Sequence, residues 1–171
     1  MKTAACGKHF AVHSGPERLR HEFDAVASPK DMYETYLPAF KALVDADVEA
    51  IMCAYNRTNG EACCAHQTLL GDLLREEWGF DGHILSDCWA IVDFFAENGH
   101  GVAANAAEAS VMAVKSGVSL NCGNSYPALI EAVSQGMISE EEIDNALVKL
   151  LETHFKLGLF DSYKSNPYNQ I

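Results

Sequence analysis

The 171-residue sequence lacks the features that mark several large classes of protein. No run of apolar residues approaches the length of about 18 that a membrane-spanning helix needs. Basic residues are scarce, at 12 against 24 acidic ones, and the resulting net charge of -12 repels nucleic acids and anionic lipids. A glycine-rich phosphate loop is also missing. We therefore expect a soluble globular protein that binds a neutral or cationic small molecule and has no nucleic-acid or membrane partner.

The cysteines show no metal-binding pattern. There are six of them, at Cys6, Cys53, Cys63, Cys64, Cys88 and Cys122, and none shows C-x-x-C spacing or nearby paired histidines. A zinc site is not indicated, and we expect neither a metal nor another cofactor. Buried reduced thiols are the expected state, which suggests a reducing compartment, although the adjacent Cys63-Cys64 pair leaves oxidation open. No signal peptide begins at Met1, and the compartment stays undecided between cytoplasm and periplasm.

Segments that predict β-strands alternate with segments that predict helices. The expected strands lie at residues 4–12, 48–56, 82–87 and 118–123. The expected helices run from Ser28 with an interruption at Pro38, through Leu69 to a stop at Gly79, from 103 to a stop at Gly117, from Ser125 to Gln135, and from Ser139 onward. Four strand–helix repeats predict an α/β fold with a parallel sheet and right-handed crossovers.

Polar residues at the carboxyl ends of the expected strands distinguish two versions of this fold. They are Lys8-His9, Tyr55-Asn56, Ser86-Asp87 and Asn121-Cys122. A doubly wound sheet and half of an eight-fold barrel both fit the alternation, but barrel enzymes build their active sites at this rim. A whole barrel takes about 250 residues, and this chain starts almost directly in a strand. We therefore expect residues 1–157 to form the second half of a (β/α)8 barrel, followed by a linker at 158–171.

Asp87 is the first candidate for chemistry, because it directly follows an apolar strand in "HILSDCWA". A carboxylate at this place can cap the next helix. It can also act as a nucleophile that attacks an anomeric carbon and holds the sugar as a covalent ester. Trp89, two residues later, could stack on the face of that sugar. The short motif alone does not decide between the two roles.

Four further side chains are candidates for binding. Lys8 could form a Schiff base as in an aldolase, bind phosphate, or donate hydrogen bonds to sugar hydroxyls; a surface lysine beside a core His9 is the structural alternative. The hydroxyl of Tyr55 could hydrogen-bond a carboxylate and keep it ionised, or the ring could only pack at the strand end. Arg20 and His21 lie in a charged loop that is either solvated or contacts the substrate.

Five segments in order carry a resemblance to a known family. They are "KHFAVHSGPERLRHEFDA", "ETYLPAFKALV", "IMCAYNRTNG", "LLREEWGFDGHILSDCWAI" and "LETHFKLGLFD". Together they resemble glycoside hydrolase family 3, in particular its β-glucosidase and β-xylosidase members, over nearly the whole chain. The order of the five is far more specific than any one of them.

The resemblance implies a retaining hydrolase that removes a terminal non-reducing β-linked glucose or xylose. The family nucleophile in "SDC" matches Asp87, and the sugar-binding "KH" pair matches Lys8 and His9. The tyrosine of "AYN", which lies by the nucleophile in the family, matches Tyr55, and Arg20 matches an arginine of this branch. These assignments are implied by the resemblance alone.

The resemblance also shows what this chain lacks. Counterparts of the first half of the barrel and of the following α/β sandwich domain, which supplies the acid/base glutamate in these branches, are missing. Ser119 stands where relatives commonly carry an aspartate. An N-acetylhexosaminidase branch places an acid/base histidine in the loop after "KH", where His21 lies, but its usual sequence is not present. We expect little or no turnover from the isolated chain, and a non-catalytic fragment that self-associates through exposed barrel edges is the competing hypothesis.

Overall fold

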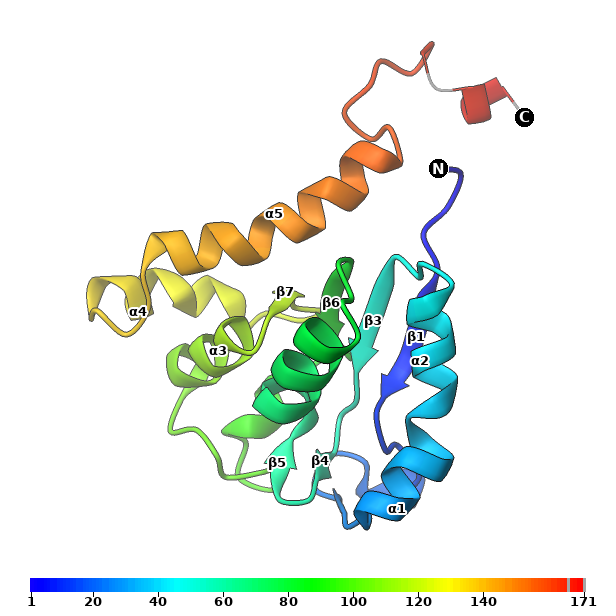
Figure 1. Ribbon diagram of the computed structural model, residues 1–171. Coiled ribbons are helices and arrows are strands. Elements are labelled where there is room, and N and C mark those ends of the chain that lie inside the picture. Colours follow the sequence, from blue (N-terminus) through cyan, green and yellow to red (C-terminus); the bar gives the residue numbers. More distant parts are fainter. Residues whose placement is uncertain (166, 171) are drawn as a thin grey trace.

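The computed structural model describes residues 1–165 and 167–170. At its centre is a four-stranded parallel sheet in which the strands are adjacent in chain order (Figure 1). The strands are β1 (Cys6–Phe10), β3 (Ala50–Cys53), β6 (His83–Ser86) and β7 (Val118–Leu120). A doubly wound sheet reverses the side on which strands are added, whereas a barrel adds each strand on the same side. The observed order confirms the barrel-like α/β fold, and each strand lies within its predicted segment.

The helices that connect these strands cover one face of the sheet (Figure 1). They are α1 (Pro29–Asp31), η2 (Met32–Tyr36) and α2 (Pro38–Asp45) after β1, η4 (Gln67–Glu77) after β3, and α3 (Ala106–Lys115) after β6. The main core fills the space between this face and the helices, with Phe10, Ile51 and Ile84 from the sheet and Leu70 and Leu74 from η4 fully buried. Removing such apolar surface from water is what holds the layers together.

The opposite face of the sheet is open. Along β1, Gly7 is buried against side chains of the helix layer, whereas Cys6 and Lys8 on either side of it are exposed. Leu120 at the end of β7 is also exposed. In a closed barrel this face lines the interior, so the chain presents as surface what a whole barrel would enclose.

The capping signals act where the sequence predicts them. Ser28 Oγ accepts the Asp31 N–H at 3.1 Å and starts the first helix. A segment of π-type hydrogen bonding then separates α1 from α2, which begins at Pro38, so the predicted interruption is confirmed. Ser139 and Glu142 form the predicted capping box of the last helix.

The C-terminal helices pack beside α3 and across the end of the sheet where the strands begin (Figure 1). They are η6 (Tyr126–Ala128), α4 (Leu129–Ser134) and α5 (Glu140–Lys156). On α5, Thr153 Oγ1 accepts a hydrogen bond from His83 Nδ1 at 2.8 Å and donates one to Glu49 Oε1 at 2.7 Å. Lys156 Nζ lies 3.0 Å from the same carboxylate. We call these four residues the basal network.

Short elements that the sequence did not predict surround the opposite end of the sheet. A three-stranded sheet joins β2 (Asp24–Ala25), β4 (Arg57–Thr58) and β5 (Glu61–Ala62). Single turns of 3-10 helix at this end are η1 (Glu17–Leu19), η3 (Cys63–Ala65) and η5 (Val92–Phe94), whereas η7 (Pro167–Gln170) lies at the other end, near the N-terminus (Figure 1). Together with the loops after β1, β3 and β6, the first six of these elements form the carboxyl rim of the sheet.

Two expectations concern the chain as a whole. Among the described residues, no helix is both long and apolar enough to cross a membrane. The expected linker at 158–171 includes residues 166 and 171, which lie outside the described residues, and the domain boundary at 157 stays a prediction.

Candidate active site

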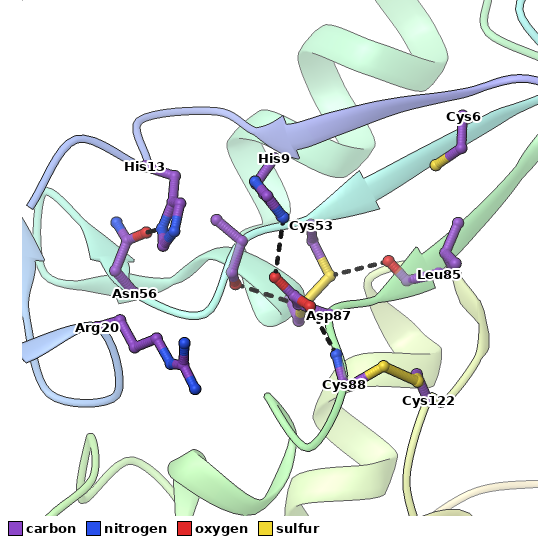
Figure 2. A network of polar contacts seen from close by, with 12 residues as sticks. Cys6, His9, His13, Arg20, Cys53, Asn56, Leu85, Asp87, Cys88 and Cys122 are labelled. Carbon is purple, nitrogen blue, oxygen red and sulfur yellow. Dashed lines mark hydrogen bonds and ion pairs between the residues drawn. A yellow bond between two sulfur atoms is a disulfide. The ribbon is translucent and has the colours of Figure 1, made fainter. Parts of the chain in front are cut away.

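Asp87 lies at the centre of the carboxyl rim, directly after β6. It is 7% exposed, and its Oδ1 accepts the N–H of Cys88 at 2.8 Å. Its other oxygen, Oδ2, lies 3.2 Å from Nε2 of His9 (Figure 2). The next short helix, η5, has no side-chain cap. The helix-capping alternative for Asp87 is therefore wrong, and the carboxylate is held at the rim by the backbone and by β1.

The Lys8-His9 pair occupies the end of β1 beside this carboxylate. Burial lowers the pKa of His9, and the charge of Asp87 only partly opposes that effect, so the ring is neutral near pH 7. Nε2 of this ring lies near Asp87 Oδ2, but that buried oxygen has no hydrogen-bond partner among the described residues. Lys8 is exposed on the open face of the sheet and forms no ion pair with any residue the structure describes. Its ammonium group is free to donate to a ligand.

Tyr55 and Arg20 lie together on the other side of the site. The pKa of Tyr55 is raised by burial and, after that, by the negative charge of the nearby Asp87 carboxylate. The phenol therefore stays protonated and can donate to the carboxylate. The guanidinium carbon of Arg20 lies 5.2 Å from the centre of the Tyr55 ring. This distance is within the range of a cation–π contact.

Trp89 stands at the surface of the site in an unusual backbone conformation. Its side chain is 53% exposed, and its φ of 69° lies in the left-handed region that non-glycine residues rarely adopt. The turn is held by the Trp89 N–H, which donates to the Cys122 carbonyl at 2.6 Å, and by a disulfide between Cys88 and Cys122. An exposed indole on a fixed turn next to Asp87 can form an apolar platform.

The expectation of reduced thiols is wrong for four of the six cysteines. Cys53 pairs with Cys64, eleven residues later, and Cys88 pairs with Cys122. Only Cys63 is the buried free thiol that was expected, and burial raises its pKa to about 11. Disulfides persist in oxidising compartments, so the argument for a reducing compartment no longer holds.

Sequence reasoning missed two residues of the rim, His13 and Asp93. His13 Nδ1 donates to Asn56 Oδ1 at 3.0 Å, and its ring centre lies 4.8 Å from that of His9. Asp93 accepts from His21 Nδ1, with 2.8 Å between the nitrogen and Oδ2. Asn56 was noted at a strand end, and its Nδ2 donates to the Val12 carbonyl at 2.9 Å. Asp93 carries no local signal, because its partner is 72 residues away in the chain.

The predicted residues therefore meet at one place. Asp87, His9, Tyr55, Arg20 and Trp89 come from four loops or strand ends of the carboxyl rim. In the part of the chain that the structure describes, no group of three or more His, Cys, Asp or Glu side chains is placed to hold a metal ion. The arrangement offers a buried carboxylate close to hydrogen-bond donors and aromatic surface, a combination that is compatible with binding a sugar.

Comparisons with known proteins agree with this reading. Residues 1–153 match the family description "Glycosyl hydrolase family 3 N terminal domain". The chain is 46% identical to a xylan 1,4-beta-xylosidase of Xylanibacter ruminicola, over 99% of this chain and 20% of that protein. It is 44% identical to a probable exo-1,4-beta-xylosidase of Aspergillus clavatus, over 98% of this chain and 23% of that protein.

Solved structures show the same likeness in three dimensions. A GH3 exo-beta-xylosidase in complex with a xylobiose aziridine probe superposes with a TM-score of 0.90 at 30% identity, over 97% of this chain and 22% of that one. A β-glucosidase from Listeria innocua in complex with glucose superposes with a TM-score of 0.84 at 31% identity, over 98% and 23% of the two chains. The chain thus spans about a fifth of the length of its relatives, and it belongs to glycosyl hydrolase family 3.

Proposed function

We propose that the chain is the part of a retaining exo-β-xylosidase that carries the nucleophile, and that this nucleophile is Asp87. The observation that carries the proposal is the buried carboxylate at the end of β6, which lies 3.2 Å from His9 Nε2 and beside Tyr55. Xylose is proposed over glucose because the curated relatives at 44% to 46% identity are named xylosidases, and because the xylosidase structure superposes with a TM-score of 0.90 against 0.84 for the glucosidase at nearly the same identity.

In the proposed reaction, a carboxylate oxygen of Asp87 attacks the anomeric carbon of the terminal xylose. The bond from that carbon to the leaving oxygen breaks as the ester bond forms, and the leaving oxygen takes a proton from an acid. Water then attacks the ester with the help of the same group acting as a base, which releases xylose and restores the carboxylate. Lys8, His9 and Arg20 bind sugar hydroxyls, Tyr55 donates a hydrogen bond to the carboxylate, and Trp89 stacks on the sugar.

The acid/base group is expected outside this chain. His21 is the candidate within it, but its Nε2 accepts a hydrogen bond from Arg20 Nε at 3.0 Å, and a nitrogen that accepts has no proton to give. The geometry therefore does not favour the N-acetylhexosaminidase alternative. Without an acid, the isolated chain should turn over little or none of an unactivated xyloside.

The nucleophile can be tested without the acid. The folded chain is incubated with a 2-deoxy-2-fluoro-β-xyloside that carries a dinitrophenyl leaving group, which departs without protonation, and the adduct is located by peptide mass mapping. We expect an adduct on Asp87 that is absent from Asp87→Asn and present in Asp144→Asn, a matched change at an exposed position of α5. An adduct on another carboxylate, or none on folded protein, would contradict the proposal for this chain. Faster labelling by the corresponding glucoside would assign glucose instead of xylose.

The competing hypothesis of self-association rests on the edges of the sheet. Within residues 1–165 and 167–170, β1 and β7 each have one edge that no other strand pairs with, and the face between them is open. Unpaired strand edges of this kind recruit further strands. We expect oligomers in light scattering, and a monodisperse monomer with a cooperative melt would show that the chain is stable with its edges free.

A further inference from the structure

Arg20 is a candidate binding residue that is connected to the protein interior by a series of side-chain contacts. Its Nε donates to His21 Nε2 at 3.0 Å, and His21 Nδ1 lies 2.8 Å from Asp93 Oδ2. The guanidinium stacks on Tyr55, and the His21 ring also contacts Tyr55, with 4.8 Å between the ring centres. Two loops, one after β1 and one after β6, are joined through these side chains.

The chemistry of the donors fixes where the proton on His21 lies. An arginine side chain has donors and no acceptor, so the nitrogen that receives Arg20 Nε–H must be unprotonated. Neutral His21 therefore carries its proton on Nδ1, which donates to Asp93. Without such a partner, Nδ1–H is the less common of the two neutral forms in water. Asp93 is thus what makes His21 an acceptor for Arg20.

Of the two carboxylates at the ends of this series of contacts, Asp93 is buried and Glu17 is exposed. The Asp93 side chain is 10% exposed, and its backbone carbonyl also accepts the His100 N–H at 2.6 Å. Arg20 has a second partner in Glu17, but that carboxylate is 76% exposed, and exposed ion pairs hold side chains weakly. Nη2 of Arg20 has no hydrogen bond to the described residues. In Figure 2 the Arg20 side chain extends toward Asp87.

We propose that Asp93 and His21 are positioning residues: they fix the guanidinium of Arg20 on the face of Tyr55, so that its free N–H groups bind a hydroxyl of the sugar held at Asp87. The sugar-binding part of this inference rests on the proposed function. The positioning part does not, because it concerns the proton on His21 and the hydrogen bond of Arg20, which exist without a ligand.

The positioning part is tested by nitrogen NMR on the uniformly labelled 171-residue chain at a pH where histidines are neutral. We expect His21 to show a protonated Nδ1 and an unprotonated Nε2, and the Arg20 Nε–H to exchange slowly with water. In Asp93→Leu the proton should move to Nε2 and the Arg20 signal should lose its protection. Asp93→Asn should restore both, because the amide oxygen still accepts. Glu17→Gln is the matched control and should change neither signal.

If Asp93→Leu does not fold, His21 itself gives the same test. His21→Gln keeps an acceptor for Arg20 and should preserve the slow exchange of Nε–H, whereas His21→Leu should abolish it. A wild-type His21 with its proton on Nε2, or an Arg20 signal that is unaffected by Asp93→Leu and His21→Leu, would overturn the proposal.

The sugar-binding part is tested by the concentration dependence of Asp87 labelling with the fluoroxyloside. Loss of one hydrogen bond to a charged group weakens binding about tenfold. Asp93→Leu should therefore raise the half-saturating concentration about tenfold with little change in the maximal rate, and Asp93→Asn should restore it. An unchanged half-saturating concentration, with the NMR changes present, would overturn the sugar-binding role. Failure of the wild type to label would reject the proposed nucleophile, while the NMR result still decides the positioning role.

Discussion

The two ends of the sheet differ in how their polar side chains are satisfied. At the end where the strands begin, the basal network bonds Glu49, His83, Thr153 and Lys156 to one another. At the carboxyl rim, Lys8 has no ion pair in the described part of the chain, and Asp87 is buried with one donor on Oδ1. Buried polar groups in folded proteins normally have hydrogen-bond partners, so a buried polar group without one calls for an explanation. The polar groups of the basal network are thus satisfied by one another, whereas the rim keeps polar groups with capacity for further hydrogen bonds.

His100 is a buried histidine near the carboxyl rim whose ring nitrogens lack hydrogen-bond partners in the described part of the chain. It lies in the loop after β6, 7% exposed, with both ring nitrogens buried and unbonded to the described residues. Burial, followed by the positive charge of Arg57, lowers its pKa to about 4. The corresponding basal histidine, His83, also has a lowered pKa because of burial, but it donates to Thr153 and lies near the charge of Glu49. A buried histidine thus has a hydrogen-bond partner at the basal end, whereas the buried histidine near the rim has none among the described residues.

The largest expected effect comes from removing the rim disulfide. The double change Cys88→Ala and Cys122→Ala opens a bridge between residues 34 apart, which should lower the free energy of unfolding by about 4 kcal/mol. It should also slow the labelling of Asp87, since the turn that carries Trp89 loses its covalent tie. Denaturant titration under oxidising conditions measures the first effect, and Cys6→Ala, at an exposed free thiol, should leave both quantities unchanged. Equal stability of wild type and double variant would mean that the bridge does not form.

A change in the basal network should affect stability alone. Thr153→Val leaves the buried Nδ1–H of His83 without an acceptor and removes one of the two donors to Glu49 Oε1, the other being Lys156, which should cost about 2 to 3 kcal/mol. Labelling of Asp87 on the protein that remains folded should keep its rate. Thr35→Val, at an exposed position, serves as the control in the same denaturant titration. Slower labelling of the folded Thr153→Val protein would show that the two ends are coupled.

The smallest of the three effects depends on pH. The pKa of His100 is about 4 in the folded chain and about 6.5 in the unfolded chain. Its contribution to stability is therefore present above pH 6.5 and is lost as the pH falls toward 4. Between pH 7 and pH 5 the loss should be about 2 kcal/mol.

His100→Phe should remove this part of the pH dependence, because the ring can still stack on Phe94 and no longer titrates. Denaturant titrations at pH 7 and pH 5 compare it with His154→Phe, a change on the half-exposed part of α5 that should keep the slope of the wild type. An unchanged slope in His100→Phe would show that other groups cause the loss.

The sequence predicts the fold better than it predicts the site. Apolar segments placed all four main strands, and Ser28, Pro38 and Ser139 marked helix boundaries, because these signals act within a few residues of the position that they determine. The short strands β2, β4 and β5 were missed, since two residues carry no periodicity.

Within the site, too, the residues that follow a strand could be predicted, whereas the contacts between loops could not. Asp87 could be placed because it ends a strand, and its neighbours His9 and Tyr55 end adjacent strands. The pair Asp93 and His21, and the disulfide of Cys88 with Cys122, depend on loops that meet only in the folded chain. Which loops meet is a property of tertiary packing, so composition and spacing suggested reduced thiols where the structure has bridges.

The chain order of the strands has a consequence for how the protein is made. Each strand of the main sheet pairs with the strand that precedes it among β1, β3, β6 and β7, and each connecting helix packs on the sheet that already exists. Contacts between successive units cost less loop-closure entropy than contacts between the ends of a chain. The sheet can therefore grow in the order of synthesis, with each strand–helix unit docking on the previous one as it leaves the ribosome.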